Sequence, residues 1–448
     1  MENRSQTQAI NGDFQLPEPI IHRVQSFLTA YEAARTTILS KSWRSAWLTR
    51  PNLDLDLYFM GGDDLEYANK TIQRYEQSNL KIESLRLCIW SPLGGDFVHL
   101  ANDLFTRALK IGATHLSFRH SPRKVILPQV VFEAENLVEL SVHGCKIDDL
   151  ESDRKVRCSK LESLNLSSVT INSEMISSIA SCCPLIEKLS LCNVVPFNDD
   201  DDLDYSFSRL HSLKDLTLRG CRTQEVSSRS LERLCFATER YMSVKFDVPS
   251  IRKFRFEIEG DEIPSLFFEP ASSEWESDVF IKNFRSGLSA LLFRRLNKLL
   301  TELSLSRIYL YLNMGLLYLY KSCQYEMGDI RDLPKPKVES LTLDTWCLRA
   351  LDYFALFHGL FQICRPKFIT TIYRMRGDSI GKNNLLCKTL ALGLDDKSMY
   401  DLHDLEEVNV HFFDEDVDAW QPMQLESLLD PSISIGIQKF RFQLIWKP

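Results

Sequence analysis

The chain has 448 residues, of which 44% are hydrophobic and 25% are charged, and its formal net charge is −8 at pH 7. This length exceeds the size at which a single hydrophobic core stops growing, so we expect two globular domains or a small domain joined to an elongated array. An acidic chain without a basic cluster is not typical of proteins whose main partner is nucleic acid or an anionic membrane, and it favours protein partners.

Residues 1–13 are polar and carry no periodic apolar pattern, so we predict a disordered lead-in. They lack the apolar core of a signal peptide. The longest apolar run, Ile308–Tyr320, is shorter than the roughly 18 residues needed to cross a bilayer, and we expect it to be buried. These features predict an intracellular, soluble protein of the nucleus or cytoplasm.

Residues 16–50 have the apolar spacing of short helices. Pro17 and Glu18 suit the first turn of a helix, where a missing N–H costs nothing and a carboxylate meets the positive end of the dipole. Apolar residues recur every three or four positions from Ile20 onward, and Ser40 suits the start of a further helix. The segment is therefore predicted to form three helices, too small to be stable without the rest of the chain or a partner.

This segment resembles the F-box of plant proteins, whose pattern runs LPxxIIxxIxSFLxxxxAxRTSxLSKxWRxxWxxxPxLxLD. The matching residues are Leu16, Pro17, Ile20, Ile21, Ser26, Phe27, Leu28, Ala33, Arg35, Thr36, Leu39, Ser40, Lys41, Trp43, Arg44, Trp47, Pro51, Leu53 and Asp54. The chain departs from the pattern at Val24, Gln25, Thr29 and Ser42. We place the F-box at residues 14–60.

The resemblance implies that the F-box binds a Skp1-type adaptor. By resemblance, the residues that make or frame the adaptor surface are Leu16, Pro17, Ile20, Ile21, Val24, Leu28, Leu39 and Trp43. Some of them must instead pack the three helices against one another, and the sequence does not divide the two groups.

A strand pattern follows, because Leu53, Leu55 and Leu57 alternate with polar residues. From there a six-residue pattern, apolar-x-x-apolar-x-apolar, returns along the chain. Its members are Ile82-Leu85-Leu87, Leu137-Leu140-Val142, Leu161-Leu164-Leu166, Ile186-Leu189-Leu191, Leu213-Leu216-Leu218, Leu231-Leu234-Phe236, Ile251-Phe254-Phe256, Leu300-Leu303-Leu305, Val338-Leu341-Leu343, Leu405-Val408-Val410 and Ile437-Phe440-Phe442. The members that start at 137, 161 and 186 lie about 24 to 25 residues apart, which is within the period of leucine-rich repeats.

Each repeat is predicted to place its last two apolar residues inward from a short strand, and a turn then leads the chain away. Cys145 and Cys221 occupy this turn in two repeats, while Val169 and Val194 stand near the same place in two others. Asn172 is suited to start a helix between two of the strands. We therefore predict an α/β fold, in which a small three-helix F-box precedes a curved leucine-rich-repeat solenoid with an inner parallel sheet, at residues 61–448.

The repeats become irregular after about residue 260. Asn198–Asp204 is an acidic run that we expect to be a solvated loop, with a patch for a basic partner as the alternative. Pro264–Asp278 contains three aromatic residues, which either pack in the core or anchor a partner from an inserted loop. The strand at Ile437–Trp446 is expected to close the array, and the signature of the FBD domain found in related plant proteins is not evident here.

Outward side chains of the strands form the natural surface for a target protein. These positions become locally basic at Lys253 and Arg255. Two roles are open for this pair, either binding an acidic segment or a phosphate of a target, or forming a solvated strand face.

The sequence indicates no catalytic chemistry. It contains no phosphate-binding loop, dinucleotide-binding, zinc-protease or serine-hydrolase motif. Its twelve cysteines are spread without CxxC pairs, so we expect reduced, buried thiols and predict no metal and no cofactor.

The family resemblance implies a non-catalytic receptor subunit of an SCF (Skp1–cullin–F-box) E3 ubiquitin ligase. Such a subunit binds a Skp1-type adaptor and, through it, a cullin and a RING subunit, while its repeats hold a target for ubiquitination and proteasomal degradation. Two alternatives without a ligase role stay open: a leucine-rich-repeat interaction scaffold and a small-molecule receptor.

Overall fold

The computed structural model describes residues 16–58, 63–90, 98–121, 125–147, 156–196, 207–239, 241–260, 262–269, 274–282, 288–313, 330, 333–345, 350–373, 380–414, 416–429 and 439–447. The chain forms two compact units, unit 1 up to Leu161 and unit 2 from Glu162. The predicted lead-in at 1–13 lies outside the described residues, and so does the acidic run Asn198–Asp204.

Unit 1 begins with a group of short helices: α1 (Glu18–Ser26), α2 (Ala30–Arg35), the 3-10 turn η1 (Thr36–Ile38) and α3 (Lys41–Thr49). Helices α1 and α3 begin at the positions that the sequence indicated. Pro17 precedes α1, and the Ser40 hydroxyl accepts a hydrogen bond from the backbone N–H of Trp43 at the start of α3. We call residues 16–50 the helical module.

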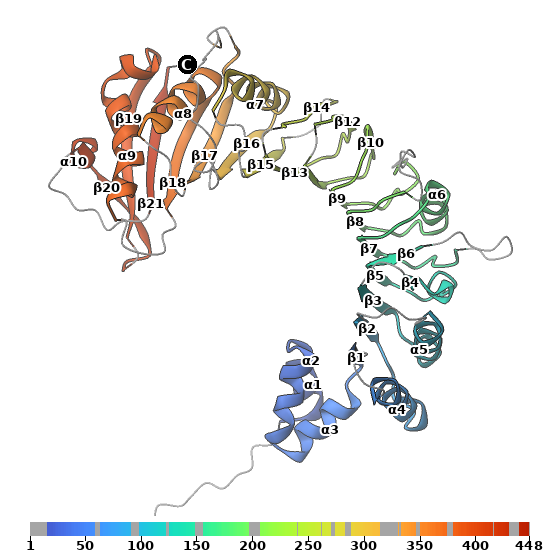
Figure 1. Ribbon diagram of the computed structural model, residues 1–448. Helices are drawn as coiled ribbons and strands as arrows, with labels where there is room; N and C mark the ends of the chain where they lie inside the picture. The colour runs from blue at the N-terminus through green and yellow to red at the C-terminus, as the bar shows by residue number, and fades with distance from the viewer. Residues whose placement is uncertain are drawn as a thin grey trace, which may run out of the picture. The chain divides into compact units, whose positions relative to one another are not determined.

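The rest of unit 1 is a parallel sheet in the order β1 (Asn52–Tyr58), β2 (Ser84–Trp90), β3 (His115–Ser121) and β5 (Glu139–His143). The connections carry α4 (Asp63–Gln77), α5 (Val98–Ile111), the 3-10 turn η2 (Gln129–Val131) and the paired short strands β4 (Val125–Ile126) and β6 (Cys145–Lys146). Figure 1 shows α4 and α5 side by side along this sheet. Arg107 of α5 binds Glu76 of α4 through two hydrogen bonds of 2.8 Å, which ties the two helices together.

Unit 2 is also built around a parallel sheet, as Figure 1 shows. Its parallel strands are β7 (Ser163–Ser167), β8 (Lys188–Cys192), β9 (Asp215–Arg219), β11 (Arg233–Thr238), β13 (Lys253–Glu259), β15 (Glu276–Lys282), β16 (Arg307–Asn313), β17 (Lys337–Thr345) and β18 (Arg365–Tyr373). A second parallel sheet joins β10 (Glu225–Ser227), β12 (Ser243–Asp247) and β14 (Ser265–Phe268). The helices are α6 (Ser173–Cys182), α7 (Ala290–Glu302), α8 (Ala350–Ile363), α9 (Ile380–Asp395), the 3-10 turn η4 (Lys397–Tyr400) and α10 (Leu425–Leu429). This mixed α/β arrangement with a large parallel sheet is consistent with a leucine-rich-repeat solenoid.

The turn after the strand has a common backbone conformation in four repeats. Gly144, Ser168, Asn193 and Gly220 all have a positive φ, between 51° and 76°. The residue that follows each of them, Cys145, Val169, Val194 or Cys221, is buried. Glycine adopts this conformation without strain, and asparagine tolerates it better than most residues. The predicted equivalence of the cysteines and valines is therefore confirmed: a positive-φ residue turns the chain, and a small apolar residue then enters the core.

One predicted repeat near the middle of unit 2, Leu300-Leu303-Leu305, is wrong. Leu300 and Leu303 belong to the end of α7, and Leu305 is 73% exposed, because residues three apart also share a helix face. The strand at this place is β16, two residues later. The strands β15 and β18 are additional members of the parallel sheet that the six-residue pattern did not identify.

The aromatic residues of Pro264–Asp278 belong mainly to the core, and an inserted loop is the wrong interpretation. The segment contains β14 and the start of β15. Phe268 stacks on Phe246 with ring centres 4.8 Å apart, and Trp275 is 4% exposed. Only Phe267 of the three reaches the surface substantially.

The C-terminal strands are antiparallel and not further repeats, which corrects two predicted members. β21 (Lys439–Trp446) pairs antiparallel with both β18 and β19 (Leu405–Asp414), and β20 (Ala419–Met423) pairs with β19. β21 therefore does not close the array, since it lies between two other strands. The period-two burial of β21 resembles that of a repeat strand, because inward alternation is independent of strand direction, whereas in β19 only Leu405 and Val410 are buried. Ile437 lies outside the described residues.

The predicted apolar run Ile308–Tyr320 is described only up to Asn313, where it forms β16 with Ile308, Leu310 and Leu312 buried. In the part of the chain that the structure describes, no helix has both the length and the apolar character required to span a membrane.

The aromatic core beneath β13 provides a test of this packing. Phe254 is fully buried and contacts the rings of Phe268 and Trp275, so Phe254→Ala leaves a cavity. We expect it to lower the free energy of unfolding by about 3–5 kcal/mol. The matched control is Phe267→Ala, whose ring is 40% exposed, with an expected cost of about 1 kcal/mol or less. Chemical denaturation followed by fluorescence measures both, and equal costs would contradict the packing.

Candidate functional site

The helical module exposes an unusual number of large apolar side chains. Ile20 and Val24 are exposed on α1, and the exposed Phe27 caps the C-terminal end of this helix; the spacings of four and three residues place the three side chains on one face. Three further large apolar side chains are exposed after α1: Tyr31 on α2, Ile38 of η1 and Leu39. Of these, Ile38 is 87% exposed. We call these six residues the apolar surface. Monomeric proteins rarely expose so many large apolar groups on so small a module unless a partner covers them.

The residues that the resemblance implies for adaptor binding differ in their exposure to solvent. Pro17, Ile20, Val24 and Leu39 are exposed, while Leu16, Leu28 and Trp43 are half-buried. Ile21 is fully buried, and its position is that of a residue packing the helices together. Phe27, Tyr31 and Ile38 were not nominated. Phe27 could have been found from the sequence, because it lies one helical turn after Ile20 and Val24 on the same stripe. No sequence signal indicates that Tyr31 and Ile38 are exposed.

Gln25, a departure from the family pattern, lies inside the helical module. Its side chain is buried, and Nε2 donates to Thr36 Oγ1 at 2.9 Å and to the carbonyl of Trp43 at 3.2 Å. Gln25 lies on α1, Thr36 is in η1 and Trp43 is in α3, so one side-chain amide joins three segments of the module. Gln25 is therefore a structural residue and leaves the apolar surface unchanged.

Thr29, the second departure, has a local structural role. Its hydroxyl accepts a hydrogen bond from the backbone N–H of Glu32, and the Glu32 carboxylate accepts one from the backbone N–H of Thr29 at 2.9 Å. This capping box satisfies two N–H groups at the start of α2. The hydrogen bonds to Thr29 lower the pKa of Glu32.

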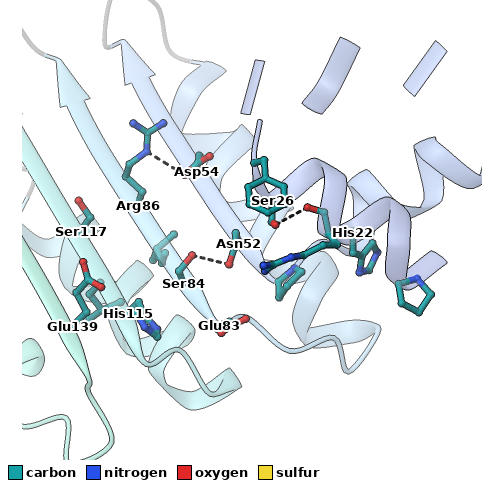
Figure 2. Close-up of a pocket in the computed structure, with 16 residues that line it drawn as sticks. His22, Ser26, Asn52, Asp54, Glu83, Ser84, Arg86, His115, Ser117 and Glu139 are labelled. Atoms are coloured by element: carbon teal, nitrogen blue, oxygen red, sulfur yellow. Dashed lines mark hydrogen bonds and ion pairs between the residues drawn. The ribbon is translucent and has the colours of Figure 1, made fainter. Parts of the chain in front are cut away.

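A polar groove of about 710 Å³ lies in unit 1 between α1 and the first strands of the sheet. Figure 2 shows His22 and Ser26 of α1 facing Asn52, Ser84 and other polar residues of the strands. Arg86 Nε donates to Asp54 Oδ1 at 3.1 Å and Ser84 Oγ donates to Asn52 Oδ1 at 3.0 Å, so these groups are engaged with one another. Across the described residues, no three His, Cys, Asp or Glu side chains are placed to hold a metal ion.

The buried cysteines are poor nucleophiles. Burial raises the pKa of Cys88 to about 11 and that of Cys145, Cys364 and Cys387 to about 12. Since the thiolate is the reactive form, these four residues are inert thiols at neutral pH.

The predicted basic pair on β13 has two different environments. Lys253 forms an ion pair of 3.0 Å with Asp278 of β15. Arg255 instead donates to Glu257 Oε1 at 2.7 Å, and Arg219 of β9 donates to Glu257 Oε2 at 3.0 Å. Lys282 Nζ lies 3.7 Å from Glu257 Oε2. We call Arg219, Arg255 and Lys282 around Glu257 the cation cluster. Sequence reasoning missed Arg219 and Lys282, because only strand register places them beside Glu257.

The Glu257 carboxylate is ionised because of this environment. Burial alone would raise its pKa, but the hydrogen bonds from Arg219 and Arg255, with the charge of Lys282, outweigh that effect and lower the pKa to about 2. A single carboxylate therefore fixes the positions of three cations.

Comparison with known proteins adds independent findings. Residues 106–253 match a family model described as "FBD-associated F-box protein At5g56370, LRR repeats". The Arabidopsis thaliana F-box/LRR-repeat protein At3g59210 is 29% identical over 54% of this chain and 48% of its own length. The putative F-box/LRR-repeat protein At5g02930 is 24% identical over 75% of this chain and 67% of its own, and F-box/LRR-repeat protein 25 is 25% identical over 48% and 80%. Both are also from Arabidopsis thaliana. The chain thus spans about half the length of the first of these relatives.

The ionised Glu257 leads to a pH-dependent prediction. Its native pKa of about 2 lies below the ordinary value of 4.5, so its ionisation stabilises the native state above pH 4.5, and this contribution is lost as the pH falls towards 2. We expect Glu257→Gln to lower the free energy of unfolding at pH 7 by roughly 1.5 kcal/mol or more. The difference from wild type should shrink between pH 4.5 and 2.

Urea unfolding at a series of pH values measures this difference. The control is Glu259→Gln, on the same strand and exposed, whose effect should be small at every pH. A Glu257→Gln effect that is independent of pH would show that ionisation of this group does not stabilise the fold.

Proposed function

We propose that this chain, for which the comparisons support a plant F-box/leucine-rich-repeat family, is the substrate-recognition subunit of an SCF E3 ubiquitin ligase. In this proposal residues 14–60 are the F-box, and residues 61–448 hold a curved leucine-rich-repeat domain that ends in the antiparallel strands β19, β20 and β21, which are not repeats. The F-box binds a Skp1-type adaptor and, through it, a cullin and a RING subunit. The repeats hold a target protein, which is ubiquitinated and degraded by the proteasome, in the nucleus or cytoplasm.

The observation that carries this proposal is the apolar surface of the helical module. Each of its large side chains contributes about 1.5–3 kcal/mol when it is fully removed from water, so a partner that covers several of them binds with useful affinity. Because the sheet that follows the module leaves these residues exposed, an external partner is required to bury them. The family resemblance supports a Skp1-type adaptor as that partner.

The proposed mechanism is recruitment without bond chemistry in this chain. A receptor that binds adaptor and target at once turns an encounter between the target and the conjugating enzyme into an intramolecular one, which raises their effective concentration. The chain is then a non-catalytic subunit, and its contribution to the rate lies in position and orientation. Of the two residues that the sequence suggested for holding the target, Arg255 remains a candidate, whereas Lys253 is ion-paired with Asp278.

Leu39 on the apolar surface allows a matched test of adaptor binding. We expect Leu39→Ala to weaken binding of a Skp1-type adaptor by about 2 kcal/mol, roughly thirtyfold in Kd, because a central anchor of the interface is truncated. The control is Leu305→Ala, which removes the same atoms from a side chain that is 73% exposed in unit 2, and it should bind like wild type. Co-purification and calorimetric titration measure binding, and circular dichroism verifies the fold of both variants.

Two outcomes would contradict the proposal in different ways. If the wild-type chain does not bind the adaptor, the ligase role fails and an interaction scaffold is left. If Leu39→Ala and Leu305→Ala both bind like wild type, the apolar surface is not the adaptor site. Ile21→Ala is not suitable for this purpose, since Ile21 is fully buried and its truncation destabilises the module itself.

A further inference from the structure

The cation cluster is built by strand register across four strands of unit 2. Arg219 of β9 lies opposite Ala237 of β11, Ala237 lies opposite Glu257 of β13, and Glu257 lies opposite Phe280 of β15. These four residues therefore form one row across four neighbouring strands of the sheet, of which β9, β13 and β15 are labelled in Figure 1. They lie on the face opposite the buried leucines and phenylalanines, which is the face open to a partner.

Ala237 makes the central contact possible. Its side chain is a single methyl group, so the Arg219 side chain reaches over β11 to Glu257 on the second strand away. Arg255 approaches the other oxygen of the same carboxylate from within β13. The Glu257 side chain is only 10% exposed, whereas those of Arg219, Arg255 and Lys282 are 45–46% exposed. The carboxylate is thus the base of the cluster, and the cations are its accessible rim.

An aromatic ring fixes one of the two guanidinium groups. The Arg255 guanidinium lies over the Phe280 ring, 4.4 Å from its centre, and the Phe280 ring is 5.5 Å from that of Tyr311. Stacking on a ring face restrains the orientation of the guanidinium, and less entropy is lost when it binds an anion. Each guanidinium carries five N–H groups, more than one shared carboxylate can accept.

The charges around the cluster leave it positive. Arg233 is paired with Asp215 through a hydrogen bond of 2.7 Å, and Lys253 is paired with Asp278, so these neighbours offset one another. Within the cluster three cations surround Glu257, and Glu259, opposite Lys282 in register, adds one further carboxylate. Cations still outnumber carboxylates, on a chain whose net charge is −8.

We propose that the cation cluster binds an acidic segment of the target protein, through clustered carboxylates or a phosphate. This inference rests on the proposed function, because it supplies the chemistry of the target that the receptor holds. Arg219 and Arg255 donate hydrogen bonds to the anion, and Lys282 contributes its charge. Lys253 takes no part, since its ammonium is engaged by Asp278.

Fluorescence anisotropy with the full chain tests the proposal. The probes are a fluorescent peptide of alternating glutamate and glycine, and the same peptide with phosphoserine at its centre. A peptide with glutamine for glutamate is the negative control. We expect Arg219→Ala with Arg255→Ala to weaken binding at least about tenfold, because two charge-assisted hydrogen bonds are lost. The matched control is Arg233→Ala, on the same face and 51% exposed, which should bind like wild type.

A second variant protects the test against misfolding, because the double substitution leaves the buried Glu257 without its two hydrogen-bond donors. Lys282→Ala retains both of those hydrogen bonds and should weaken binding about threefold, the loss of one exposed charge. Thermal melting followed by circular dichroism verifies that each variant is folded.

The outcomes separate this inference from the proposed function. Binding of either peptide that is lost in the cluster variants and kept in Arg233→Ala supports the inference, and the tighter peptide identifies the anion as carboxylate or phosphate. If Arg233→Ala weakens binding as much as the double variant, only diffuse charge is involved and the inference is overturned. It is also overturned if wild type binds neither peptide. Adaptor binding, measured on the same preparations, then decides the proposed function independently.

Discussion

The packing of inward side chains beneath neighbouring parallel strands is the interaction on which both units depend. A single unit of strand, turn and helix leaves its apolar face exposed, and only the next unit along the chain covers it. In unit 2 this layer runs from Leu166 under β7 to Leu343 under β17, and both residues are almost fully buried. The positive-φ turns after the strands contribute to the same packing, because each turn places a small cysteine or valine against the buried layer.

Only every second residue of a strand points into this layer, so the side chains at the remaining positions do not pack in the core. They determine what the open face of the sheet can bind, and register decides which of them meet. The row from Arg219 to Phe280 shows the consequence: a methyl group at Ala237 is enough to let an arginine reach a carboxylate two strands away. A larger residue at that position would keep Arg219 and Glu257 apart while leaving the core unchanged. The character of the binding face is thus separable from the stability of the fold.

The helical module differs from the repeats, since it is too small to bury all of its apolar residues. Its interior is held by Ile21, Ala33 and Ala46, with the buried amide of Gln25 joining the segments through hydrogen bonds. What is left over forms the apolar surface. The residues that depart from the F-box pattern at positions 25 and 29 therefore serve the interior and a helix cap, and the surface available to a partner is unaffected.

The sequence by itself determined the helix starts at Pro17 and Ser40, the alternation of β1, the regular repeats between Leu137 and Phe256, and their buried cysteines. These features are local, since capping, period-two burial and turn conformation depend on residues close in the chain. It failed at Leu305, because a spacing of three residues suits a helix as well as a repeat, and at β19 and β21, because alternation carries no information about strand direction. Only the tertiary structure decided which apolar residues of the module are exposed and which cations surround Glu257. Both depend on contacts between residues distant in the chain, and a local pattern cannot specify those contacts.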